Sequence, residues 1–222
     1  SSGLAESVRN LRTSLLLRDA QNPPRVVLTT SSVPGEGKST LAMMLAQNAA
    51  AMGRKVLIVE ADLRRPTFAR FLGGGGGAGL AGILRGGASL DEATEHHAGS
   101  GFDVMCGGSA TVNPADLFSG AAYGDLVAEL KQRYDFIVID APPVLPVPDA
   151  RLLAGSADAV LYAVRWKKTS KMQVQLGLGM LRSVGARVAG LAMTQVNEAR
   201  MARYQGYGGY GAYRAGKAYH AN

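Results

Sequence analysis

The sequence contains a single cysteine, Cys106, among 222 residues. One thiol cannot form an internal disulfide, and no partner set for a metal cluster accompanies it, so neither kind of crosslink is expected. The chain also lacks any run near the roughly 18 apolar residues that a membrane-spanning helix requires, and it shows no N-terminal signal-peptide pattern. These absences predict a location in the cytoplasm, and leave open a membrane segment outside these residues.

Acidic residues are missing from the end of the chain except for Glu198. After it come four cations: Arg200, Arg203, Arg214 and Lys217. Such a segment suits nucleic acid, an anionic membrane surface or an acidic site on another protein, although a solvated tail without a partner is commoner. The whole chain has a formal net charge of +7, and its 47% hydrophobic content is typical of one packed domain.

Short apolar runs alternate with helical patterns along most of the sequence. A β-branched run at 25–30 leads into a glycine-rich turn, a helix over 39–52 and a second strand at 55–60. This order predicts an α/β fold with a mostly parallel sheet, right-handed crossovers and flanking helices. Similar patterns predict a helix over 6–17, strands at 102–105, 136–139, 159–164 and 188–193, and helices over 121–134 and 170–184.

We expect one domain over residues 1–197 that begins with a helix at about 4–18. The remainder, 198–222, is rich in Gly and Tyr without periodicity and is therefore expected to be a flexible tail. Five consecutive glycines at 73–77 predict a loop within the domain. The apolar face of the first helix is expected to consist of Leu4, Val8, Leu11 and Leu15.

The segment SVPGEGKS, from Ser32 to Ser39, follows the first strand and opens a helix. It matches the Walker A phosphate loop except that Ser32 replaces the first glycine, and its strand–loop–helix context disfavours an ordinary glycine-rich turn. Glycines let backbone N–H groups surround a phosphate, Lys38 supplies charge to the β- and γ-phosphates, and the Ser39 hydroxyl can bind Mg²⁺. The expected nucleotide-binding residues are Val33, Pro34, Gly35, Glu36, Gly37, Lys38, Ser39 and Thr40.

Two acidic residues follow predicted strands. Asp140 ends the run FIVID, a Walker B arrangement whose carboxylate can hold Mg²⁺, usually through water. Asp62 follows the strand after the phosphate-loop helix, at the sheet edge where ligands bind, and is placed to reach the metal or accept a proton from an attacking hydroxyl. The alternative for Asp62 is to cap the next turn or to pair with Arg64. The expected catalytic residues are Lys38, Asp62 and Asp140, and the expected metal ligands are Ser39, Asp62 and Asp140.

The nucleotide is expected to be ATP. A guanine-reading Asn-Lys-x-Asp element is absent from the sequence, and the last predicted strand continues into TQVN at 194–197 instead.

Several further motifs resemble the bacterial tyrosine kinases (BY-kinases) linked to capsule and exopolysaccharide export, within the wider Mrp/MinD-like class of P-loop ATPases. The run EADLR at 60–64 is similar to their additional Walker A′ motif, although Glu60 stands where the family usually carries Asp. The segments NPADL, DAPP and DAR, beginning at 113, 140 and 149, also resemble the family.

The N-terminal helix carries a pattern similar to the family's oligomerisation motif: Glu6, Arg9 and Arg12 at three-residue spacing. The alternative is a modest intrahelical pair, worth about 0.2–0.5 kcal/mol. Five of the eight tyrosines lie in the last nineteen residues, among glycines. They are either phosphate acceptors or part of a low-complexity tail that is merely adhesive. The resemblance implies that the phosphoacceptors are Tyr204, Tyr207, Tyr210, Tyr213 and Tyr219.

The resemblance implies an ATP- and Mg²⁺-dependent protein-tyrosine kinase that phosphorylates its own tail, in trans within a ring-like homo-oligomer, and so regulates polysaccharide polymerisation or export. Asp62 would orient or deprotonate the phenol, whose pKa of about 10 keeps it protonated at neutral pH. The implied partners are a transmembrane polysaccharide co-polymerase, fused or separate, and a protein tyrosine phosphatase. The implied location is the inner face of the bacterial cell membrane.

Two rival functions remain. A positioning or partitioning ATPase of the MinD/ParA kind would be a nucleotide switch without kinase activity. Such ATPases carry an extra lysine at the position of Val33 and tend to end in an amphipathic helix or a DNA-binding surface, and this sequence has neither pattern. A nucleic-acid binder could use the basic, aromatic tail, but the intact phosphate and metal residues make nucleic acid a poor primary partner.

Overall fold

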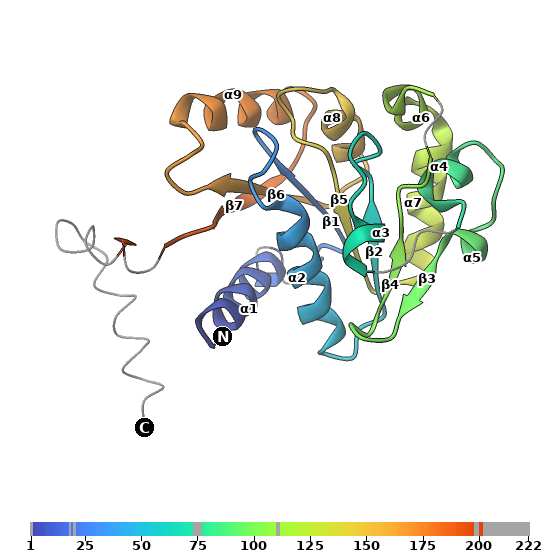
Figure 1. The fold of residues 1–222 in the computed structure, drawn as a ribbon, viewed down its shortest axis with the longest axis horizontal. Helices are drawn as coiled ribbons and strands as arrows, with labels where there is room; N and C mark the ends of the chain where they lie inside the picture. Colours follow the sequence, from blue (N-terminus) through green and yellow to red (C-terminus); the bar gives the residue numbers. More distant parts are fainter. Residues whose placement is uncertain are drawn as a thin grey trace.

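Seven strands form one sheet in the part of the chain that the structure describes, which comprises residues 2–17, 19, 21–72, 77–109, 112–197 and 200–201 (Figure 1). The structure is a computed structural model, in which the strand order is β3-β4-β2-β5-β1-β6-β7. All neighbouring strands are parallel except β3 and β4, so the predicted, mostly parallel sheet is confirmed. The strands are β1 (Val26–Ser31), β2 (Val56–Glu60), β3 (Glu95–His97), β4 (Phe102–Met105), β5 (Phe136–Asp140), β6 (Ala159–Arg165) and β7 (Val188–Thr194).

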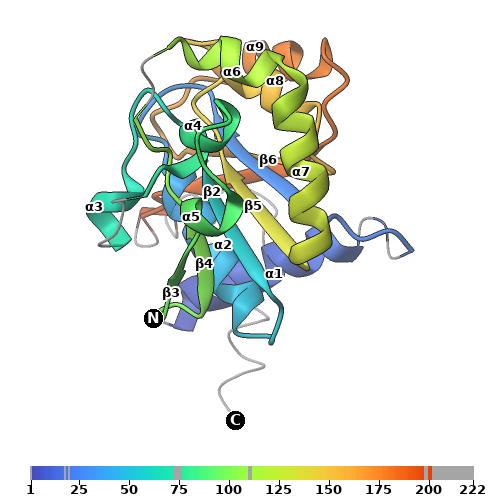
Figure 2. The same ribbon diagram turned by 90° about the vertical axis from the view of Figure 1, so that its right-hand side faces the viewer.

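Helices pack against both faces of the sheet (Figure 2). One face is covered by α1 (Ser2–Leu17), α2 (Lys38–Ala50) and α3 (Phe68–Leu72). The other face is covered by α4 (Gly79–Leu84), α5 (Leu90–Ala93), α6 (Pro114–Ser119), α7 (Ala121–Arg133), α8 (Asp149–Ala154) and α9 (Lys171–Arg182). Because both faces are covered, every residue of β1, β2 and β5 is buried. This explains why β2 and β5 are continuous apolar runs up to their last residue.

The strand register gathers three functional segments at one edge of the sheet. Thr29 on β1 lies opposite Asp140 on β5, and Glu60 on β2 lies opposite Asp140 on the other side. The phosphate loop follows β1, and Asp62 comes two residues after β2. Because these strands are parallel and in this register, their carboxyl ends meet at the same place.

The first helix packs on α2 through most of its predicted apolar face. Val8 and Leu15 are buried, and Leu11 packs partly buried against the same cluster. Leu4 was expected on this face too, but it is 58% exposed because it belongs to the first turn, near the N-terminal end of the helix.

Gly177 on α9 provides the room for a buried tyrosine of β6. A Cβ at Gly177 would lie 2.0 Å from the Tyr162 hydroxyl oxygen. Tyr162 is fully buried and its hydroxyl is 2.9 Å from Ser32 Oγ, so the ring cannot swing aside. We therefore expect Gly177→Ala to lower the free energy of unfolding by about 1–3 kcal/mol.

Gly179 in the same helix is the matched control for that substitution, because a Cβ there meets nothing within 4 Å. Gly179→Ala should raise the free energy of unfolding by about 0.5–1 kcal/mol through helix propensity. Urea denaturation of both variants measures the two effects, and the same sign for both would contradict the packing described here.

Candidate active site

The phosphate loop joins β1 to α2 and contains two glycines in the left-handed region. Gly35 and Gly37 have φ angles of 81° and 83°, which residues with a Cβ rarely adopt. Gly37 is the N-cap residue of α2, and among the described residues no side chain caps this helix end. The first backbone N–H groups of α2 are therefore available to an anion. Nucleotide binding by residues 33–40 stays a prediction.

The Lys38 ammonium group lies between two carboxylates. Its Nζ is 3.0 Å from Asp62 Oδ2, 3.5 Å from Asp140 Oδ1 and 3.3 Å from Ser39 Oγ. Burial lowers the pKa of Lys38, but the attraction of Asp140 and Asp62 outweighs burial, so the pKa is raised and the amine stays charged. The structure thus brings together all four residues that were expected to be catalytic or to bind the metal.

Asp140 is the most buried member of this group, with 1% of its surface exposed. Burial raises its pKa to about 6, against the opposing influence of Lys38 and a hydrogen bond from Ser39. The carboxyl group is therefore ionised at neutral pH although it is enclosed by protein.

The oxygen donors of Ser39, Asp62 and Asp140 fit Mg²⁺ bound together with a nucleotide. Carboxylates and a hydroxyl are the hard ligands that Mg²⁺ prefers, and this ion usually completes its shell with water and phosphate oxygens. No group of three or more His, Cys, Asp or Glu side chains in the described part of the chain could hold a metal by itself. The donor set therefore suits a metal that is shared with phosphates.

Asp62 contacts Lys38 and also caps the next turn, which was one of the two structural roles considered for it. Its Oδ1 accepts a hydrogen bond from Arg65 N at 3.2 Å. The other alternative, a pair with Arg64, is wrong, because Arg64 pairs with Asp149 through Nε–Oδ2 and Nη2–Oδ1 contacts of 2.8 and 3.0 Å. Arg64 Nη2 also donates to Asn113 Oδ1 at 2.9 Å.

The pair between Arg64 and Asp149 was not predicted, although both residues lie in motifs that resemble the kinase family. They are 85 positions apart, so no local spacing rule links them. Asp149 is fully buried at the start of α8, and the pair ties the loop after β2 to this helix.

Glu60 has a structural role at the end of β2. It is 1% exposed, and its Oε1 accepts hydrogen bonds from the backbone N–H groups of Thr67 and Phe68, at the start of α3. Its Oε2 accepts a bond from Gly107 N at 2.9 Å. In the EADLR run, Glu60 therefore binds backbone N–H groups, whereas the carboxylate of Asp62 contacts Lys38.

The N-terminal motif lies on α1. Glu6 Oε2 and Arg9 Nη2 form an ion pair at 2.8 Å, whereas Arg12 Nη1 donates to Asn48 Oδ1 on α2 at 2.6 Å. The intrahelical pair is thus present for two of the three residues, and an interface role for the motif stays a prediction. The candidate phosphoacceptors Tyr204, Tyr207, Tyr210, Tyr213 and Tyr219 lie outside the described residues.

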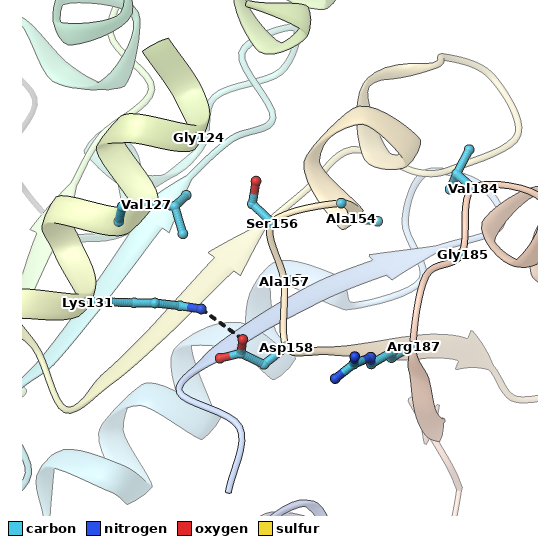
Figure 3. A pocket seen from close by; sticks show the side chains of 12 residues that line it. Gly124, Val127, Lys131, Ala154, Ser156, Ala157, Asp158, Val184, Gly185 and Arg187 are labelled. Atoms are coloured by element: carbon cyan, nitrogen blue, oxygen red, sulfur yellow. Dashed lines mark hydrogen bonds and ion pairs between the residues drawn. The ribbon is translucent and has the colours of Figure 1, made fainter. Parts of the chain in front are cut away.

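A cavity of about 490 Å³ lies beside the amino ends of β6 and β7, whereas the phosphate loop follows the carboxyl end of β1. Figure 3 shows the residues that line this cavity. Lys131, Asp158 and Arg187 line it, and Lys131 Nζ is 2.8 Å from Asp158 Oδ1. Asp158 Oδ2 accepts backbone hydrogen bonds from Arg25 and Val26 at 3.0 and 2.8 Å. The Asp158 carboxylate is thus a structural bridge between the start of β1, the end of α7 and the start of β6.

Asp158 should make stability depend on pH. Burial raises its pKa, but the hydrogen bonds from Lys131, Val26 and Arg25 outweigh burial and the net pKa is lowered. A lowered folded-state pKa gives stability that is present above the unfolded pKa and is lost as pH falls through the folded pKa. We expect Asp158→Asn to cost about 1–2 kcal/mol at pH 7, at the low end for charged hydrogen bonds because the side chain is 33% exposed.

Urea denaturation at pH 7 and at about pH 3 tests this, since the difference from the unchanged chain should shrink at the lower pH. Asp125→Asn, on the exposed side of α7, is the control and should leave the free energy of unfolding unchanged at both pH values. A difference that is the same at both pH values would contradict the role of the Asp158 charge.

A family model described as "ATPase MipZ" matches residues 25–165, from the start of β1 to the end of β6. The tyrosine-protein kinase YwqD of Bacillus subtilis is 33% identical over 189 residues, which cover 85% of this chain and 80% of YwqD. The tyrosine-protein kinase Wzc of Salmonella typhimurium is 30% identical over 86% of this chain, but the match spans only 27% of Wzc. The solved kinase domain of the Escherichia coli tyrosine kinase Etk superposes with a TM-score of 0.82 at 28% identity, covering 87% of this chain and 77% of that one.

Fold and site define a P-loop ATPase of the class that the MipZ model describes. Within this class the chain belongs to the bacterial tyrosine kinases, and it is a protein-tyrosine kinase. The family expected from the sequence motifs is thereby confirmed. Among the described residues, no helix is both long and apolar enough to cross a membrane.

Proposed function

We propose that this kinase transfers the γ-phosphoryl group of ATP to tyrosines of its own C-terminal segment. The observation that carries the proposal is the position of Lys38 between Asp62 and Asp140, beside a phosphate loop, in a chain that belongs to the tyrosine kinases. Five tyrosines in the last nineteen residues supply acceptors within the same chain. We propose residues 1–197 as the catalytic domain and 198–222 as the substrate tail.

Each group at the site is assigned a role. The segment 33–40 surrounds the phosphates, with the backbone N–H groups at the start of α2 as donors, and the Lys38 ammonium neutralises charge that develops on the transferred group. Ser39, Asp62 and Asp140 are the proposed ligands of Mg²⁺, which supplies positive charge to the phosphate oxygens when it is bound with ATP. Asp62 is also placed to orient the phenol or take its proton.

Transfer between subunits of a ring-like homo-oligomer is the form of the reaction that we favour. At full extension, the chain beyond Asn197 can place Tyr204 up to about 25 Å away and Tyr219 up to about 75 Å away, enough to reach a neighbouring subunit. The Glu6 and Arg9 side chains on α1 are about half exposed, at 45% and 55%, and so are accessible to a second copy.

The cellular role follows from the family. We propose control of polysaccharide polymerisation or export, with a transmembrane co-polymerase as activator and a protein tyrosine phosphatase as antagonist. The proposed location is the inner face of the bacterial cell membrane. The chain spans about a quarter of Wzc, so most of that relative lies outside the part that this chain matches.

Mass spectrometry after incubation with Mg·ATP tests the acceptor sites. The transfer route is tested by mixing a Lys38→Met subunit with an active subunit whose five tail tyrosines are replaced by Phe. Phosphotyrosine on the inactive subunit is expected, and an unlabelled inactive subunit would contradict transfer between subunits. ATP hydrolysis without phosphotyrosine in any mixture would favour the nucleotide-switch alternative.

A further inference from the structure

Glu36 lies within the phosphate loop, yet its side chain is 1% exposed. Its Oε2 accepts a hydrogen bond from Val33 N at 2.8 Å, across the loop itself. Its Oε1 accepts a hydrogen bond from Thr169 Oγ1 and lies 3.4 Å from Arg165 N. One carboxylate therefore closes the phosphate loop and fastens it to the segment between β6 and α9.

The end of β7 holds the backbone of the same loop. Thr194 Oγ1 donates to Glu36 O at 2.5 Å, and Gln195 Nε2 donates to Gly35 O at 3.0 Å. Gln195 has a φ of 52°, a left-handed conformation that costs a residue with a Cβ on the order of 1–2 kcal/mol. Gln195 thus bonds the phosphate loop from a backbone conformation that is itself unfavourable.

The negative charge of Glu36 calls for a physical reason, because a carboxylate beside a phosphate site repels the ligand. Both of its oxygens accept hydrogen bonds from protein, namely from Val33 N, Thr169 Oγ1 and Arg165 N. An apolar side chain of similar size would leave Val33 N and Thr169 Oγ1 without this acceptor, at a cost of about 1–3 kcal/mol per buried group. The carboxylate is therefore suited to set loop geometry.

We propose that Glu36 is a positioning residue of the kinase, which holds the phosphate loop in the conformation that receives the triphosphate. Through Thr169 the same loop is coupled to the segment between β6 and α9. Through the carbonyl groups of residues 35 and 36 it is coupled to the end of β7, from which the tyrosine-bearing segment continues. Glu36 acts through Val33 and Thr169 and its carboxylate does not contact the phosphates. This inference rests on the proposed kinase function and adds a residue that the phosphate-loop motif leaves unspecified.

Autophosphorylation kinetics of the full chain test the proposal. A misplacement of about 1 Å can cost about 100-fold in rate, so we expect Glu36→Gln to lower kcat by about 10- to 100-fold. Thr169→Val should lower kcat about 10-fold, whereas Thr169→Ser keeps the hydroxyl and should stay within about threefold of the unchanged chain. The matched control is Glu92→Gln, because Glu92 lies in the exposed capping box of α5. A kcat and KM within twofold of the unchanged chain for Glu36→Gln, or equal losses for both Thr169 variants, would overturn the proposal.

A second measurement separates this proposal from the kinase function itself. Affinity for a fluorescent ADP analogue is measured on the same variants, with thermal unfolding to show that each is folded at the assay temperature. Weaker binding by Glu36→Gln and Thr169→Val, but not by Glu92→Gln, supports the positioning role even if the unchanged chain makes no phosphotyrosine. Equal affinities in all of these variants would overturn it.

Discussion

Lys38→Met is expected to form phosphotyrosine about 10³-fold more slowly than the unchanged chain. Methionine keeps the length and apolar stem of lysine but removes the ammonium that lies 3.0 Å from Asp62 and 3.5 Å from Asp140. Charge that develops on the transferred phosphoryl group would then lack its protein counter-charge. Initial rates with radiolabelled ATP and Mg²⁺ measure the loss.

Lys171→Met is the control for this variant, because Lys171 is exposed at the start of α9 and takes no part in the phosphate loop. It should leave the rate within about twofold. Retention of more than a tenth of the rate by Lys38→Met, in protein with an unchanged circular dichroism spectrum, would remove Lys38 from the proposed mechanism.

Arg64→Met is expected to lower the free energy of unfolding by about 3 kcal/mol, because it leaves the carboxylate of Asp149 buried without its partner. The value is taken at the low end for a broken buried pair, since 35% of the Arg64 side chain is exposed. For a domain of this size the loss corresponds to a fall in Tm of about 6–12 °C. Thermal and urea unfolding measure it.

Arg65→Met is the neighbouring control, since the Arg65 side chain makes no ion pair among the described residues and only its backbone N–H bonds Asp62. A double variant, Arg64→Met with Asp149→Asn, should lose less than the sum of the single losses, because the uncompensated charge is gone. Equal Tm values for the Arg64 and Arg65 variants would show that the pair contributes little.

Local sequence patterns accounted for the longer elements of the fold. The strands expected at 25–30, 136–139 and 159–164 begin and end within one residue of β1, β5 and β6. Their apolar runs are long enough to show burial on both faces, and the glycines around Lys38 mark a turn that few other sequences can adopt. The short elements β3, α3 to α6 and α8 were not predicted, because runs of three to six residues are too short to show a period.

Local patterns along the chain predicted an α/β P-loop protein, with Lys38 in the phosphate loop and with Asp62 and Asp140 at the ends of strands. These features can be read from the sequence because each depends only on residues that are close together in the chain. The roles of the other polar residues depend on contacts between distant parts of the chain, which become visible only in the folded structure. Arg64 pairs with Asp149, Glu60 holds the start of α3, and the Glu36 carboxylate fastens the phosphate loop to Thr169. Arg64 and Asp149 are 85 positions apart in the sequence, and Glu36 and Thr169 are 133 positions apart. A charge that is removed from water is costly unless it is hydrogen-bonded, and the packing of distant segments determines which partners are within reach.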